Sequence, residues 1–161
     1  MNYGLSQTEQ LVDLLFNAVE SIDDVSNKNV FLDWEVFRLY IETSNGLKIN
    51  LETKIIDPSG TNEYITWKKI RDMIKIFFDT NSLMGITIDI RMRLPKDLKL
   101  EIDPNGDYHY FNLSFYSKNE VVMVSTTAVE KNLSSSYKPV EQWNDYISNI
   151  INVWKLKKGI A

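Results

Sequence analysis

The fold of this chain is decided by FRLYIETSNGLKINLET, residues 37–53, where two alternating apolar and polar runs flank Asn45-Gly46. An Asn-Gly pair favours a two-residue hairpin turn because both residues tolerate a positive φ. That turn would place Leu39 opposite Glu52, so that apolar and polar side chains would share each face of the hairpin. The turn signal and the face pattern therefore favour different registers.

A three-residue loop over residues 44–46 resolves this conflict. It places Ile41 opposite Ile49 and Leu39 opposite Leu51, so that one face of the hairpin is wholly apolar. Burial of one face fixes the register of a strand pair strongly. We therefore predict the three-residue loop, with its glycine in the left-handed conformation.

Upstream of this hairpin the apolar positions change parity. Val30, Leu32 and Trp34 alternate out of step with Leu39 and Ile41. A β-bulge near residues 36–37 would reconcile the two runs. Burial of the first run on both faces would reconcile them equally well.

Downstream, residues 86–94 alternate and the same parity returns over residues 98–102, beyond Pro95. Two arrangements fit: a hairpin closed at residues 95–97, which we prefer, or one long strand kinked at the proline. The sequence DPNGD at residues 103–107 then predicts a turn. Strands should follow it over residues 108–117 and 121–126, with a loop over residues 125–138.

Three stretches have helical periodicity, at residues 6–22, 66–78 and 139–158. The residues expected to be buried against the sheet are Trp67, Ile74, Phe77, Trp143, Ile147 and Ile150. The predicted fold is α+β, in one domain spanning residues 1–161. A hairpin and a meander supply an antiparallel sheet of five to six strands, and three helices pack mainly on one face.

The composition gives no indication of catalytic or metal chemistry. The chain has no cysteine and one histidine, His109, for which a structural role is favoured over an acid–base one. We expect no catalytic residues, no metal and no cofactor, and a chain that is not an enzyme. The N-terminus has no signal-peptide pattern and no apolar run reaches the length of a membrane span, so we expect a cytoplasmic location without membrane contact.

Charge is distributed unevenly along the chain, whose net charge is −4. Residues 1–66 contain 11 acidic and 4 basic residues, whereas residues 67–161 contain 14 basic and 11 acidic ones. This asymmetry is compatible with a charged partner, although scatter over a folded surface explains it as well.

One predicted sheet face is rich in the residue types of contact hot spots. Tyrosines alternate along residues 108–116, and arginines alternate on the strand before them. The candidate binding residues are Arg91, Arg93, Tyr108, Tyr110 and Tyr116. Tyrosine pairing across strands on a solvated face is the competing interpretation.

In its order of helix, hairpin, helix and strand, the chain resembles small α+β immunity proteins of bacterial polymorphic toxins. The resemblance lies in residues 67–78, in residues 100–116 and in the Asp-x-x-Gly turn at Asp103. It implies a cytoplasmic protein-binding module that occludes a cognate toxin or another partner protein, without a cofactor. The alternative is a nucleic-acid or small-ligand binding domain that uses the Tyr/Arg face, which the acidic balance disfavours.

Overall fold

The computed structural model describes residues 7–159 except 24, 27, 45, 47, 53–64, 73–82, 93, 119–120 and 132–135. Its strands are β1 (Glu35–Thr43), β2 (Lys48–Glu52), β3 (Ile65–Thr66), β4 (Leu83–Met92), β5 (Tyr108–Lys118) and β6 (Val121–Glu130). Its helices are α1 (Gln7–Asn17), α3 (Lys96–Ile102) and α4 (Lys138–Lys158), and residues 67–72 are also helical. The predicted α+β class is confirmed, with one helix more than expected.

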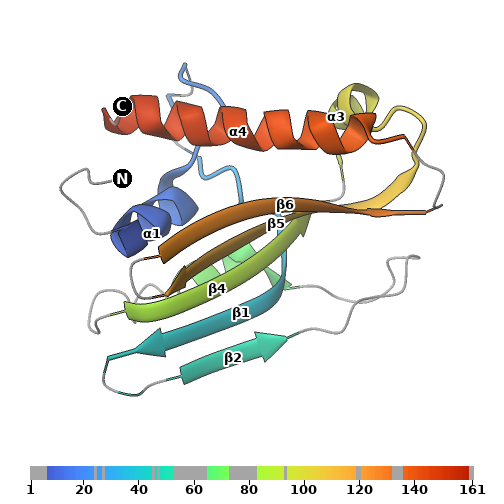
Figure 1. Cartoon of the computed structure of the whole chain (residues 1–161). Coiled ribbons are helices and arrows are strands. Elements are labelled where there is room, and N and C mark those ends of the chain that lie inside the picture. Colours follow the sequence, from blue (N-terminus) through green and yellow to red (C-terminus); the bar gives the residue numbers. More distant parts are fainter. Residues whose placement is uncertain are drawn as a thin grey trace.

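The strands form an antiparallel sheet in the order β2-β1-β4-β5-β6, and β3 pairs with the start of β1. Helices α1 and α4 lie on the same side of this sheet (Figure 1). Under them the sheet presents Leu39, Ile88, Leu113 and Phe115, each at most 2 % exposed. The core therefore sits between one sheet face and two helices.

The register predicted from residues 37–53 is confirmed. Ile41 pairs with Ile49 and Leu39 with Leu51, and Gly46 has a φ of 87°. The Gly46 N–H donates to the Thr43 carbonyl over 3.1 Å. The pairing of β1 with β4 shifts between Val36 and Arg38, which is the predicted bulge.

Residues 96–102 form helix α3, so the predictions of a hairpin and of a kinked strand were both wrong. Leu98, Leu100 and Ile102 suit a strand face, but Leu98 and Ile102 are also one helical turn apart. The helix buries Ile102 at 3 % and leaves Leu100 65 % exposed. Pro95 precedes the helix as its N-cap residue, so its missing N–H leaves no helical hydrogen bond unmade.

The turn at residues 103–107 forms as predicted. The Asp103 carboxylate accepts hydrogen bonds from the N–H groups of Asp107 and Tyr108, over 2.9 and 3.0 Å. Gly106 has a φ of 67°. After this turn β5 and β6 pair along their whole length, and β6 continues to Glu130 where a loop was expected from residue 125.

The expected burial of Trp67, Trp143, Ile147 and Ile150 is confirmed, with exposures between 0 and 3 %. Ile74 and Phe77 lie outside the described residues. The Trp143 indole N–H donates to the Asn112 carbonyl over 3.0 Å, which ties α4 to β5.

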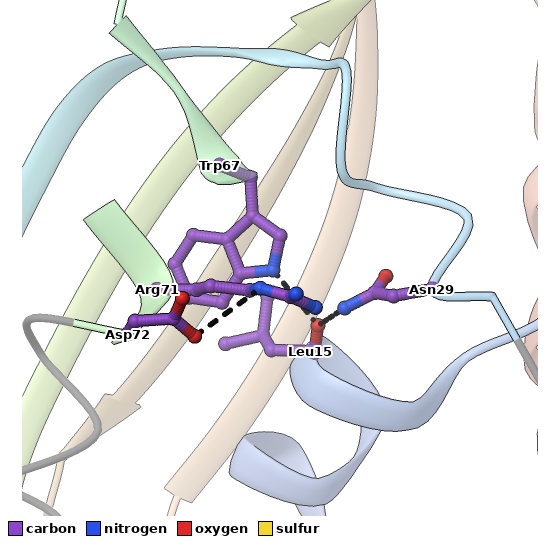
Figure 2. Close-up of polar contacts among 5 residues, drawn as sticks. All are labelled: Leu15, Asn29, Trp67, Arg71 and Asp72. Carbon is purple, nitrogen blue, oxygen red and sulfur yellow. Dashed lines mark hydrogen bonds and ion pairs between the residues drawn. The ribbon is translucent and has the colours of Figure 1, made fainter. Parts of the chain in front are cut away.

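The end of α1 is held by a buried polar contact (Figure 2). The Leu15 carbonyl accepts hydrogen bonds from the Asn29 amide over 2.7 Å and from the Trp67 indole over 3.1 Å. The Asn29 oxygen accepts from the Phe31 N–H over 2.9 Å. The last carbonyls of a helix lack helical partners, so these contacts satisfy one of them and fix the chain between α1 and β1.

Candidate functional site

Two of the predicted binding residues, Arg91 and Tyr110, lie together but are buried. Their exposed fractions are 2 and 5 %, so the expectation that they face solvent was wrong. The Arg91 guanidinium carbon lies 4.5 Å from the centre of the Tyr110 ring and 5.4 Å from that of Phe37. Its Nε donates to a Glu35 carboxylate oxygen over 2.9 Å.

One β-bulge contributes to the burial of Arg91, and a second one moves Tyr108 off the face that Tyr110 shares with Arg91. The bulge at Phe37 brings its ring over Arg91, and the pairing of β5 with β6 shifts at His109, between Tyr108 and Tyr110. The prediction that Tyr108 and Tyr110 share one face required an unbroken strand from residue 108. The change of parity before Phe37 indicated the first bulge as one of two alternatives, whereas no such signal precedes the second bulge.

The other predicted binding residues lie apart from this pair. Tyr108 is 8 % exposed and donates its hydroxyl to the Ser136 carbonyl over 2.7 Å, so its expected exposure was also wrong. Tyr116 is 40 % exposed, opposite Met123 of β6. Arg93 lies outside the described residues. The Tyr/Arg face is thus not a continuous exposed surface among the residues that the structure describes.

A cleft of about 510 Å³ opens where the chain enters β1 and leaves β4, beside α3 and α4. Among the residues that the structure describes, five carboxylates and one arginine line it, and this arginine, Arg91, is ion-paired with one of the carboxylates. The carboxylates belong to Glu20, Asp33, Glu35, Asp97 and Glu101. The cleft therefore carries an excess of negative charge.

The rest of the cleft wall is largely apolar. Trp34, Met92, Pro95 and Leu98 line it together with the carboxylates. Trp34 and Met92 also belong to the core, so this part of the wall is rigidly supported. A long basic side chain could lay its methylene stem on such a wall and bring its charge to the carboxylates.

Tyr146 of α4 closes one side of the cleft. Its hydroxyl donates to a Glu20 carboxylate oxygen over 3.3 Å. Burial raises the pKa of Tyr146 well above its usual value. The charge of Glu20, the hydrogen bond to Glu20 and the charge of Glu101 raise this pKa further, in that order of size. Tyr146 is therefore a neutral hydrogen-bond donor at physiological pH.

The sequence indicated only part of this cleft. The acidic excess of residues 1–66 includes Glu20, Asp33 and Glu35, but Asp97 and Glu101 come from the half with a basic excess. They join the cleft because residues 96–102 form a helix beside α4 rather than a strand. Because residues 96–102 were predicted as a strand, Asp97 and Glu101 could not be assigned to this cleft from the sequence.

Within the described ranges, no group of three or more carboxylate or imidazole side chains could hold a metal ion. His109 lines a separate hollow of about 220 Å³ with Lys99, Asp103 and Lys131, on the other side of α3's C-terminal turn. No helix of the described chain is long and apolar enough to cross a membrane.

Comparisons with known proteins add no relative to this picture. A scan against protein-family models found no match, and searches of curated proteins and of solved structures found none either.

Proposed function

We propose that this chain is a non-enzymatic protein-binding module whose acidic cleft receives a basic side chain of a partner protein. The acidic cleft, defined by the five carboxylates above, is the observation that carries the proposal. Its wall has apolar side chains that suit the methylene chain of arginine or lysine, and carboxylates that suit the positive charge at the end of that chain. Arginine is also among the residues that dominate binding energy at protein interfaces.

The electrostatics favour a partner with a positive surface. Carboxylates gathered in one concave region attract an oppositely charged protein and speed its association. They repel phosphate groups, which are also negatively charged. Binding to nucleic acid depends on neutralising phosphate charge, so the cleft does not suit a nucleic acid. The burial of Arg91 and Tyr110 also weakens the alternative of base stacking on the Tyr/Arg face.

The partner we favour is a toxin with a basic surface, such as a nuclease. This part of the proposal rests on the resemblance to immunity proteins together with the charge of the cleft. An immunity protein acts by occlusion and needs neither catalytic residues nor a cofactor, in keeping with a sequence that offers no triad or metal motif.

A neutralisation assay tests this function. The toxin candidate is the protein encoded beside this gene, and the readout is its toxic activity with increasing amounts of this chain. The wild type should abolish that activity, whereas a double variant, Asp33→Asn with Glu101→Gln, should require at least tenfold more protein, a loss of about 1.4 kcal/mol.

The control is Glu141→Gln with Asp145→Asn, which removes the same charge from exposed positions of α4 outside the cleft. It should neutralise as the wild type does. Equal potency of the cleft variant and the wild type would show that the cleft is not the contact.

A further inference from the structure

Strand β6 forms one edge of the sheet (Figure 1). Its ten residues, Val121–Glu130, pair with β5 on one side. Among the residues that the structure describes, no strand pairs with its other side. An edge strand presents a row of backbone N–H and C=O groups to which another strand can add.

The β6 strand lacks two of the usual features that prevent such pairing, charged residues and proline, over most of its length. Its first nine residues, VVMVSTTAV, contain no charge and no proline. The opposite edge, β2, has five residues with Lys48 at one end and Glu52 at the other. Short length and charge protect an edge from another strand, so by these two criteria β2 is the better protected edge.

Apolar side chains of β6 are also exposed on both faces of the sheet. Val121, Met123 and Val129 are 55, 59 and 44 % exposed, and Val124 is 36 % exposed. Val122 and Val124 border an apolar groove of about 190 Å³ that Ile151 and Trp154 of α4 also line. Exposed apolar side chains on an unpaired strand edge are typical of an interaction site.

We infer that β6 pairs antiparallel with β6 of a second copy of this chain, with Thr126 on the two-fold axis. A two-fold interface must be complementary to itself, since each residue meets its counterpart from the other copy. Residues 123–129 read MVSTTAV, which is apolar at both ends and hydroxyl-bearing in the centre. This pattern is symmetric about Thr126.

In this register apolar residues pair with apolar residues, and residues with a hydroxyl group pair with one another. Met123 lies opposite Val129, Val124 opposite Ala128, and Ser125 opposite Thr127 of the other copy. Cross-strand apolar and hydroxyl pairs of this kind stabilise a sheet. A two-fold axis at Ser125 would instead set Met123 against Thr127 and Val124 against Thr126, which mixes apolar and polar partners.

Helix α4 runs beside β6 and presents uncharged residues near the proposed axis. The Thr126 hydroxyl donates to the Asn144 side-chain oxygen, so this part of α4 lies near the proposed axis. Ser148 and Ile151 continue the same stripe of α4 by helical spacing, and all three residues are uncharged.

Sedimentation velocity from about 1 to about 200 µM tests the inference, because dimerisation depends on concentration. We expect the mass to rise with concentration from 18.8 kDa towards twice that value. Ser125→Lys adds a charge to the exposed face of the edge and should weaken dimerisation at least tenfold. Asn50→Lys, the same change at an exposed position of β2, should leave it unchanged.

A monomer at every concentration would overturn the inference, as would a dimer unaffected by Ser125→Lys in a protein whose circular dichroism is that of the wild type. The β6 edge would then be a candidate site for pairing with a strand of a different protein. The acidic cleft shares no residue with β6, so either result leaves the proposed function standing.

Disulfide trapping tests the register, because the chain has no cysteine of its own. In Thr126→Cys the two Cα atoms at the axis would be about 4.5–5.5 Å apart, within the range of a disulfide. In Met123→Cys the two cysteines would be about 20 Å apart at roughly 3.3 Å per residue. Oxidation should therefore trap a covalent dimer of the first variant only, and trapping of the second variant alone would overturn this register.

Discussion

Asn29→Ala should destabilise the protein severely, although it removes only one small polar side chain. Asn29 is 4 % exposed, and its amide donates to the Leu15 carbonyl (Figure 2). Its side-chain oxygen accepts a second hydrogen bond from the Phe31 N–H. Each contributes about 1 kcal/mol. Phe31 is 1 % exposed, so its N–H would also be left buried without this acceptor, at a cost of about 1–3 kcal/mol.

The Leu15 carbonyl keeps its bond from Trp67, which limits the loss on that side. We therefore expect the free energy of unfolding to fall by about 2–4 kcal/mol. For a chain of this size each kcal/mol lowers Tm by about 2–4 °C, so Tm should fall by roughly 5–15 °C. Asn29→Asp keeps the acceptor but places a carboxylate beside a carbonyl oxygen, and should be worse still.

Urea unfolding followed by tryptophan fluorescence and circular dichroism measures this loss, with the m-value as a check on two-state behaviour. Asn149→Ala, at an exposed position of α4, is the control and should change stability by less than about 0.5 kcal/mol. A loss below about 1 kcal/mol for Asn29→Ala would refute the reasoning. Because Asn29 holds the segment that carries Glu20 and Asp33, the same variant should also weaken partner binding.

Three further predictions concern the core and the buried polar groups. Glu35→Gln should destabilise more than Arg91→Met, because it removes the negative charge of an ion pair and keeps the buried guanidinium, at a cost of about 3 kcal/mol; equal losses in urea unfolding would contradict this. Phe115→Ala, at a fully buried position of β5, should cost about 3–5 kcal/mol by the same measurement, and a loss under about 1 kcal/mol would mean that its burial is misassigned. The raised pKa of Tyr146 stabilises the fold below a pH of about 10, and this contribution is lost as the pH rises further. Tyr146→Phe removes this ionisation, so the variant should lose less stability in alkali than the wild type does. Urea midpoints at pH 8 and pH 10.5 measure it, and parallel losses in the variant and the wild type would argue against a raised pKa.

The hairpin from residue 37 to residue 53 could be predicted because burial of one face fixes its register. The parity change before Phe37 indicated either a bulge or burial of the first run on both faces, and the structure has the bulge. The strand prediction for residues 96–102 failed because the apolar spacing there satisfies both a strand and a short helix. Local periodicity cannot separate the two in seven residues.

The binding surface was harder to predict because burial depends on residues that are distant in the sequence. Arg91 looked exposed from the alternation of its own strand, yet Phe37 and Tyr110 cover it from two other strands. The acidic cleft likewise joins residues from the ends of α1, β1 and β4 with α3 and α4. The uneven charge of the chain was compatible with a charged partner, but it did not show which carboxylates lie together.

Isothermal titration of the partner protein with the wild type and with Asp33→Asn/Glu101→Gln tests the central claim most directly. At low salt the cleft variant should bind at least about tenfold more weakly, a loss of about 1.4 kcal/mol, and the Glu141→Gln/Asp145→Asn control should bind as the wild type does. At about 0.5 M salt the gap between variant and wild type should narrow, because screening shortens the reach of the carboxylates. Equal affinities of the cleft variant and the wild type at both salt concentrations would contradict the claim that the acidic cleft receives the partner.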